Sequence, residues 1–442
     1  MKRVIVGALV SCVVASGLQA LDTQAFYRAG LMQRLPALKE QKPVQIALRV
    51  ASGSTRDAFD GHEHKVPLFS AYGKFDLLRL GTGLDASDLV SKTTTNAFWG
   101  SSGHWADLSS GVGELDGKVD VSGRFVTTDV ALTAKVPVFF GLYAEALLPF
   151  SKLTIDNIKI TNRGAATVKS RRMDDFINTS LPLILAENGL TSLTKTIVHD
   201  LSIADPVLAL GWEGYAARLA PLVTEVAGYV QLGLSLPAAS GKDQAMPLDI
   251  ARGYNGHVGC LGRAAAEAQF FDCVTLGVQA GSSIFFPDRR QVRLKTDIQQ
   301  QGWLQLKKVT VKEDYGSIWD IGGYVGVAKI VTGLRALVGY SFTRQEVTTY
   351  TVKDADYLKD KVAAAHAELP VSVDVYANSD QRLRGWEQHV MRMALQVDTG
   401  EMFNTAIGGL VRLEYSIPVL GKYSWATDMV AGSLGCSFVW NF

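Results

Sequence analysis

The sequence predicts an all-β fold, a transmembrane antiparallel β-barrel of about 14 strands, with about 12 as the alternative, whose long extracellular loops carry short helices. Three observations predict it. The last strand alternates between large apolar residues and small or polar ones. The connections between strands alternate between short and long. Beyond the N-terminal leader, no stretch approaches the roughly 20 consecutive apolar residues that a membrane-spanning helix needs.

The first 20 residues have the three parts of a secretory signal. Lys2 and Arg3 precede an apolar run, and a small-residue exit ends at Ala20, so residues 1–20 are expected to be cleaved off. The alternative is a lipoprotein acylation box ending at Cys12, which leaves a very short apolar core. Residues 21–43 carry apolar residues at helix-like spacing, broken by Pro36, and are expected to form either a plug or a periplasmic tail. Residues 44–442 are assigned to the barrel.

The final sixteen residues carry the clearest alternation. One side of this stretch presents Val430, Gly432, Leu434, Cys436, Phe438, Trp440 and Phe442. The other side is mostly small or polar, as expected where one face of a strand meets lipid and the other a wet lumen. Aromatics at alternate positions before a terminal aromatic carboxylate resemble the C-terminal signal that outer-membrane barrels present to their assembly machinery. Phe438, Trp440 and Phe442 are therefore the expected assembly signal, and an edge strand of a soluble sheet is the alternative.

The remaining strands follow from period-two runs bounded by turn residues. In chain order they are Val44–Ala51, Leu68–Leu80, a weak one in Leu84–Thr95, Val119–Ala134, Phe139–Pro149, Ile203–Tyr215, Leu222–Leu236, Gly253–Cys260, Val274–Phe286, Ser317–Lys329, Leu334–Thr343, Trp386–Val397 and Thr405–Ile417.

The connections sort by length. Short links fall at Lys135, Ala217–Pro221, Val331 and Thr399–Phe403. Counting back from Phe442 places all four on the periplasmic side, where such barrels have short turns. The long connections are Asn96–Gly117, Ser151–Ser202, Pro287–Gly316 and Gln345–Arg384. Helix-like spacing inside them, in Leu181–Leu190 and Asp354–Leu369, predicts the short external helices.

Three cysteines remain after signal removal. Cys260 and Cys273 flank what the sequence suggests is a short connection, and two outcomes stay open, a disulfide or two unpaired thiols at strand ends. Cys436 lies on the apolar side of the last strand, where it is expected to act as a small hydrophobic residue.

Composition and motifs argue against several function classes. Lys plus Arg number 44 against 43 Asp plus Glu, and a formal charge of +1 offers no electrostatic basis for binding nucleic acid. The chain has no G-x-S-x-G, H-E-x-x-H or Walker-type motif, so neither catalysis nor a cofactor is expected. His62-Glu63-His64 is expected to be solvated rather than to bind a metal.

Alternation also identifies residues that point into the lumen. In the strands Leu334–Thr343, Trp386–Val397 and Thr405–Ile417, the apolar positions take the lipid side. Arg335, Arg392, Arg412 and Glu414 then fall on the lumen side, because a charge facing lipid at mid-depth costs about 2–4 kcal/mol. Two readings stay open for these four residues, a constriction that contacts solute or an ion-pair network that braces the wall.

The stretch from Asp200 to Trp212, followed by Val230 to Pro237 and a Gly/Asp-bearing loop, resembles the repeated hairpin of the long-chain fatty-acid and aromatic-hydrocarbon (phenol meta-pathway) transporter superfamily. The resemblance implies a passive outer-membrane channel for small solutes, hydrophobic ones included. The expected partners are outer-membrane lipid, the barrel-assembly machinery and the solute. The superfamily's N-terminal Asn-Pro-Ala motif is absent, and no binding residue carries over. The alternative is a structural or adhesin-like barrel that binds partners through its extracellular loops.

Overall fold

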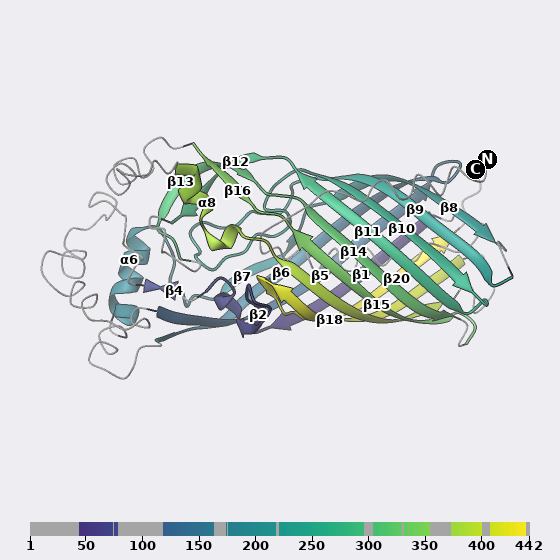
Figure 1. Ribbon diagram of the computed structural model, residues 1–442, viewed down its shortest axis with the longest axis horizontal. Coiled ribbons are helices and arrows are strands. Elements are labelled where there is room, and N and C mark those ends of the chain that lie inside the picture. The colour runs from purple at the N-terminus through teal and green to yellow at the C-terminus, as the bar shows by residue number, and fades with distance from the viewer. Residues whose placement is uncertain are drawn as a thin grey trace, which may run out of the picture.

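In the computed structural model, twelve antiparallel strands close into a barrel (Figure 1). The structure describes residues 44–73, 75–77, 118–162, 174, 176–217, 221–295, 304–328, 331–353, 373–399 and 407–438. In ring order the strands are β1 (Val44–Thr55), β5 (Lys118–Pro137), β6 (Leu142–Asn162), β8 (Val207–Ala217), β9 (Val223–Ser235), β10 (Gly259–Phe270), β11 (Val274–Phe285), β14 (Ile318–Ala328), β15 (Leu334–Gln345), β17 (Glu387–Asp398), β18 (Ile407–Lys422) and β20 (Asp428–Phe438).

The first and last strands of the ring close it. β1 pairs along its length with β20, from Val44 opposite Phe438 to Ser54 opposite Asp428, and its other edge pairs with β5. All backbone ladders of the ring are antiparallel and no open edge remains between its strands, which is the condition for strands to cross a bilayer.

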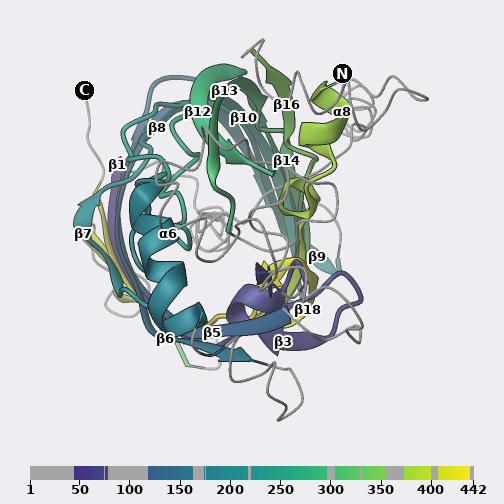
Figure 2. The same ribbon diagram turned by 90° about the vertical axis from the view of Figure 1, so that its left-hand side faces the viewer.

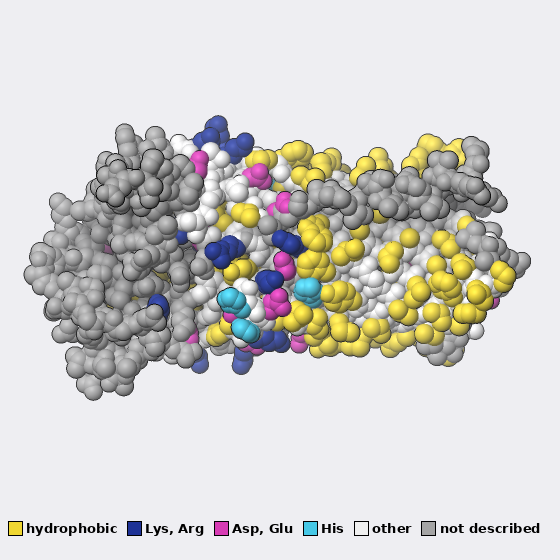
Figure 3. Space-filling model, in the orientation of Figure 1, with side chains coloured by type: hydrophobic (Ala, Val, Ile, Leu, Met, Phe, Trp, Pro, Cys, Tyr) yellow, Lys and Arg dark blue, Asp and Glu magenta, His cyan; other side chains and the backbone are white. Residues whose placement is uncertain are grey.

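The outer surface of the barrel is apolar. Because side chains alternate along each strand, every second residue points outward. Examples from around the ring that are exposed on this surface are Leu48, Leu132, Leu210, Leu232, Val278, Val325, Met393, Leu413 and Val430. On the face that Figure 3 shows, hydrophobic side chains form a belt over the strands, and charged side chains gather along one side of this belt. The fold is a transmembrane β-barrel of the outer-membrane type.

The inner surface changes character along the barrel. In β5 the inward residues Thr127, Asp129 and Thr133 are polar and at most 7% exposed, whereas Val119, Val121 and Phe125, nearer the external end, are apolar and fully buried. The polar part faces the lumen. The apolar part is covered by the external loops, so β5 and β6 extend beyond the lipid belt as walls of an external cap.

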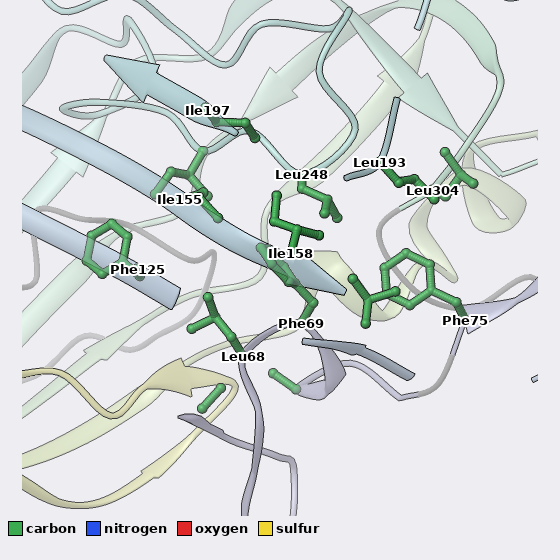
Figure 4. Close-up of a cluster of buried hydrophobic side chains, with 14 of the residues drawn as sticks. Leu68, Phe69, Phe75, Phe125, Ile155, Ile158, Leu193, Ile197, Leu248 and Leu304 are labelled. Atoms are coloured by element: carbon green, nitrogen blue, oxygen red, sulfur yellow. The ribbon is translucent and has the colours of Figure 1, made fainter. Parts of the chain in front are cut away.

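The cap has a hydrophobic core of its own. Leu68 and Phe69 belong to the 3-10 helix η1 (Leu68–Ser70) and pack with Phe125, Ile155 and residues of other loops (Figure 4). The π-helical turn η3 (Phe176–Ser180) and helix α6 (Leu181–Glu187) add Phe176, Leu181, Ile184 and Leu185. Seen along the barrel axis, α6 lies beside the mouth (Figure 2).

Two small sheets complete the cap. One sheet consists of β12 (Asp288–Leu294), β13 (Lys307–Asp314) and β16 (Thr349–Val352). Helix α8 (Val373–Asn378) packs against this sheet through Ala377. The other sheet consists of β2 (Asp57–Phe59), β3 (Lys65–Pro67) and β19 (Ser424–Trp425). β4 (Phe75–Asp76) pairs with β5, β7 (Ile197–Ile203) pairs with β6, and the 3-10 helix η4 (Gln381–Leu383) precedes β17.

The ring has the smaller of the two strand numbers that the sequence allows, twelve rather than fourteen. The expected wall strand Leu68–Leu80 is wrong: the described part of this segment, residues 68–73 and 75–77, contains η1 and the short β4. Its apolar residues are consecutive rather than alternating, and Leu68, Phe69, Ala71 and Tyr72 are all buried in the cap. The weak strand in Leu84–Thr95, residues 1–43 and the expected helix Asp354–Leu369 lie outside the described residues.

The region between two of the cysteines also differs from the expectation. It holds all but the first two residues of strand β10, which replaces the expected short strand Gly253–Cys260. Cys260 is the second residue of β10 and Cys273 follows its end, so the two thiols lie at opposite ends of the strand and are unpaired. A disulfide needs Cα atoms within about 7 Å, which excludes this pairing within one chain. Cys436 is also free and exposed on the outer surface.

The connections at one end of the barrel are short and most of those at the other end are long, as the sequence predicts; the exception at the external end is the β18–β20 link, residues 423–427. The links β5–β6, β8–β9, β10–β11, β14–β15 and β17–β18 are short and lie at one end of the barrel, opposite the cap (Figure 1). The β10–β11 link at residues 271–273 is the addition that follows from placing β10 correctly. This polarity puts the cap outside the cell and the short turns in the periplasm.

Candidate solute pathway

Three of the four sequence-predicted lumen residues lie together inside the barrel. Arg392 of β17 and Arg412 and Glu414 of β18 point inward and are 2%, 8% and 6% exposed. Arg412 Nη2 lies 3.2 Å from Glu414 Oε2, and Ser416 Oγ donates a hydrogen bond to Glu414 Oε1 at 3.2 Å. Arg392 interacts electrostatically with the same carboxylate. These three charged side chains therefore form one group on the neighbouring strands β17 and β18.

Sequence reasoning missed a fourth member of this cluster. Arg49 of β1 extends its guanidinium to 3.8 Å from Glu414 Oε1. Its neighbours Leu48 and Val50 face lipid, so the same alternation rule assigns Arg49 to the lumen. Glu414 thus lies among the guanidiniums of three strands, β1, β17 and β18. This set, Arg49, Arg392, Arg412 and Glu414, is called the lumen charge cluster below.

Arg335, the remaining predicted residue, belongs to a different part of the lumen. It points inward from β15, opposite Gln396, and interacts electrostatically with Glu267 of β10. Glu267 is 2% exposed and accepts a short hydrogen bond from the hydroxyl of Tyr324 on β14. The Tyr324 ring crosses the intervening strand β11 at Gly277, where a Cβ atom would lie 2.0 Å from the ring. A glycine is required there for Tyr324 to reach Glu267.

The wall has one interrupted strand. β7 and β8 follow one another along β6, separated by Ala204-Asp205-Pro206. Pro206 has no N–H to give to a ladder. β8 pairs with β9 on its other side, whereas the corresponding edge of β7 is covered by the loop 236–258, in which Arg252 donates to Asp200 O and to Ser202 Oγ.

Asp205 fastens this loop to the break. Its carboxylate is 1% exposed and accepts hydrogen bonds from the backbone N–H groups of Ala238 and Ala239, both at 2.9 Å, and of Tyr254. Burial raises the pKa of Asp205, and the backbone hydrogen bonds oppose that rise. Gly253 adopts φ +67, and a Cβ there would lie 2.2 Å from the carboxylate, so glycine permits the close approach.

Asp205→Asn is expected to loosen this loop. An amide offers only one acceptor oxygen, so buried N–H groups lose a partner at about 1–3 kcal/mol each. When samples are heated to increasing temperatures before electrophoresis, the variant should convert from the compact to the unfolded band at a lower temperature than the parent. Asp200→Asn, on the exposed side of β7, is the matched control and should behave as the parent. Equal behaviour of the two variants would show that the Asp205 contacts do not hold the loop.

The other expected sites have different outcomes. Phe438 ends β20, but its side chain, together with Trp440 and Phe442, lies outside the described part of the chain, so the assembly signal stays a prediction. His62 and His64 lie on an exposed turn, where both backbone N–H groups donate to Asp60. Within the described ranges, no group of three or more His, Cys, Asp or Glu side chains is placed to hold a metal ion. No helix in those ranges is long and apolar enough to cross a bilayer.

No protein-family model matches the chain, and no curated protein matches its sequence. Among solved structures, an outer membrane channel from Pseudomonas putida F1 has a TM-score of 0.47 at 8% identity, covering 92% of this chain and 99% of that one. The translocator domain of the autotransporter NalP from Neisseria meningitidis has a TM-score of 0.33 at 8% identity, with 94% and 96% covered. A Pseudomonas aeruginosa FadL homologue has a TM-score of 0.32 at 8% identity, with 96% and 100% covered. These distant likenesses concern the barrel fold, which the strand pairing establishes independently.

Proposed function

We propose that the protein is a passive outer-membrane channel for small solutes, hydrophobic ones included, with no catalytic step and no cofactor. The supporting observation is the lumen charge cluster. Keeping Arg49, Arg392, Arg412 and Glu414 inside a barrel whose outer surface is apolar costs desolvation energy, and charges placed this way commonly mark a solute pathway.

The proposed pathway starts at the external cap. Solute enters between the loops, passes the lumen charge cluster and leaves toward the periplasm or sideways. The break between β7 and β8 supports a sideways exit, because there one edge of the wall is completed by a loop rather than by a strand. A loop held by side-chain contacts opens at lower cost than a continuous ladder.

One observation favours the competing function, a structural or surface-binding barrel. Inward side chains such as Gln388, Arg392 and Glu267 are only 5%, 2% and 2% exposed, so the lumen around them is tightly filled. A permanently filled lumen would leave the external loops as the working surface.

Planar-bilayer recording separates the two functions. The purified full-length barrel is expected to insert and pass ions in discrete steps, because each inserted barrel adds one polar lumen that connects the two sides of the membrane. Heat-denatured protein at the same detergent concentration serves as the control. Membranes that stay silent while compact barrel is shown to be inserted would overturn the channel proposal and favour the surface-binding barrel.

A further inference from the structure

One turn at the periplasmic end of the barrel consists of apolar residues alone. It joins β5 to β6 and comprises Val138, Phe139, Phe140 and Gly141. Turns that face water are usually built from glycine, proline, asparagine, aspartate and serine. This link, called the aromatic turn below, therefore has the composition of a segment with surroundings other than water. Each of the other four short links contains a charged residue, namely Arg218, Asp272, Lys329 and Glu401.

The two phenylalanines of this turn are not covered by the rest of the described chain. Phe139 is 58% exposed, Phe140 is 93% exposed, and Val138 before them is 56% exposed. The ring centroids of Phe139 and Phe140 lie 5.8 Å apart in an edge-to-face arrangement, so the two rings form one apolar projection. Contiguous apolar surface of this kind marks a contact with another molecule or with a membrane.

The backbone of Phe140 is strained as well. Its φ is +44, in the left-handed region that glycine and asparagine adopt more readily than a bulky residue. Two backbone hydrogen bonds of 2.8 Å hold the turn in this shape, from Val138 N–H to Leu142 O and from Leu142 N–H to Phe139 O. A side chain that is both strained and exposed lowers the stability of the barrel itself. Phenylalanine at this position thus indicates an interaction of its ring with a partner beyond the chain.

The aromatic turn is held on the lipid side of the wall. Trp212 of β8 donates a hydrogen bond from Nε1 to Phe140 O at 3.0 Å. Trp212 lies opposite Leu142, and both side chains are exposed on the outer surface. Two charged side chains near this end of the barrel, Lys135 and Glu213, pair with each other on the lumen side. The turn is therefore fixed to the apolar outer surface.

Apolar surface continues without interruption from the turn into the lipid belt. The first outward charged residue of β6 above the turn is Lys152, which lies opposite Thr128 of β5. Every outward position of the two strands between that pair and the turn is apolar. These positions are Val130, Leu132, Ala134 and Val136 on β5 and Leu142, Ala144, Ala146, Leu148 and Phe150 on β6.

The length of this apolar surface gives the depth of the turn. Phe139 follows Thr128 by eleven residues. At a rise of about 3.3 Å per residue and a tilt of about 40°, such a length spans about 28 Å along the membrane normal. The apolar band of outer-membrane barrels is about 25 Å tall. The aromatic turn therefore lies at the inner edge of the band, where acyl chains meet headgroups.

We propose that the aromatic turn lies in the periplasmic leaflet of the outer membrane, with the rings of Phe139 and Phe140 between the acyl chains and the headgroups of its phospholipids. The contact with lipid thus extends from the strands to the connection between them, which in such barrels is otherwise a short turn in the periplasm. This anchor is independent of what passes through the lumen, so it applies to a channel and to a surface-binding barrel alike.

Fluorescence quenching in phosphatidylcholine vesicles measures the depth of the turn. A bimane label is attached at Phe140→Cys in the full-length barrel, with serine in place of the native cysteines. Lipid brominated near the glycerol end of its acyl chains quenches from the bilayer, and iodide on both sides of the vesicle membrane quenches from water. Two reference labels bracket the range. They are at Leu232→Cys, in the lipid belt, and at Lys308→Cys, on the exposed face of β13 in the cap.

The Phe140→Cys label should resemble the lipid reference. We expect brominated lipid to quench it at least about half as strongly as the Leu232→Cys label, and iodide to quench it at most about a third as strongly as the Lys308→Cys label. Iodide quenching equal to that of the Lys308→Cys label would place the turn in water and overturn the proposal. A turn that docks on a periplasmic protein or on a second copy of the chain gives that contrary result, because vesicles at a high lipid-to-protein ratio supply neither.

Substitution of Phe140 distinguishes an anchor from an ordinary turn residue. Phe140→Asn suits the positive φ, so an ordinary turn would leave the barrel at least as resistant to heat as the parent. An anchored turn instead loses its contact with lipid. The fraction of barrel that stays compact when vesicles are heated to the parent's conversion midpoint should then fall at least about threefold, measured by heat-modifiable gel mobility.

Phe140→Leu is the matched control, because it keeps a large apolar side chain on the same strained backbone. It should retain a compact fraction close to that of the parent. Gels of unheated samples verify that each variant is folded before the comparison. A Phe140→Asn barrel as resistant as the parent, or a Phe140→Leu barrel as sensitive as Phe140→Asn, would contradict the proposal.

Discussion

Glu414→Gln is expected to shift the ion selectivity of the barrel strongly toward anions. The parent holds this carboxylate among Arg49, Arg392 and Arg412, at 3.8 Å from the first and 3.2 Å from the last. Removing its charge leaves three guanidiniums facing the pathway without their shared counter-ion. If the free energy of an anion relative to a cation at this point of the lumen falls by about 1.4 kcal/mol, the ratio of anion to cation occupancy there rises tenfold. Reversal potentials across a salt gradient in planar bilayers measure the change.

The same substitution tests stability. Removing one partner of a buried ion pair typically lowers the free energy of unfolding by about 3–5 kcal/mol. Glu414→Gln should therefore also lower the temperature at which the compact barrel converts on gels. Glu63→Gln removes a carboxylate that pairs with Lys422 in an exposed loop and is the control for charge alone. A reversal potential that does not differ between the two variants would remove Glu414 from the pathway and leave the cluster as a brace for the wall.

Gly277→Ala is expected to be among the most damaging single-methyl changes in the wall. The added Cβ would lie 2.0 Å from the ring of Tyr324, so the ring must leave its place across β11. Overpacking of this kind costs about 1–3 kcal/mol, and Glu267 then loses its hydrogen-bond donor, at a further cost of about 1.5–3 kcal/mol. The fraction of compact barrel on unboiled gels after refolding should fall sharply.

Gly262→Ala is the matched control. A Cβ at Gly262 meets only Leu232 Cδ2, at 3.7 Å, which is ordinary van der Waals contact on the outer surface. Tyr324→Phe separates the two parts of the effect, because it removes the hydrogen bond to Glu267 and leaves the ring in place. If Gly277→Ala refolds as well as Gly262→Ala, the ring does not occupy this position.

Much of the wall follows from alternation alone. Strands whose lipid side is large and apolar, such as β9 with Val230, Leu232 and Leu234, are predicted almost to their ends. The inward positions of Arg335, Arg392, Arg412 and Glu414 follow from the same rule, since a shift of one residue would turn each charge toward lipid.

Alternation does not predict the position of β10, for a physical reason. Its outward positions Gly262, Ala264, Ala266 and Ala268 are small, so alternation gives almost no hydrophobic signal there. Without this strand, the connection between Cys260 and Cys273 is expected to be short, which allows a disulfide that the fold excludes. For the same reason, the pattern does not indicate Glu267 or its contact with Tyr324.

Contacts between distant parts of the chain were beyond the sequence pattern. Arg49 lies near Glu414 because β1 closes the ring by pairing with β20. The periodicity of the sequence does not predict which residues of β1 lie opposite which residues of β20. The cap is a second case. A cavity in the cap is lined by residues from loops, the 3-10 helix η4 and the β12–β13–β16 sheet, and their irregular spacing carries no period that predicts their association.

The closing register offers the most direct test of the architecture. Ile46 lies directly opposite Cys436 across the β1–β20 ladder, and both are exposed on the outer surface. Paired Cα atoms in such a ladder lie about 4.5–5.5 Å apart, within reach of a disulfide. Leu48 faces Leu434 instead, so Leu48→Cys is the control.

Mild oxidation of purified Ile46→Cys should link the two ends of the barrel, giving a covalently closed species that migrates differently on denaturing gels until reductant is added. Leu48→Cys should remain open under the same treatment. A closed ring of strands with this register is contradicted if Ile46→Cys stays unlinked while the barrel is folded, or if Leu48→Cys links equally well.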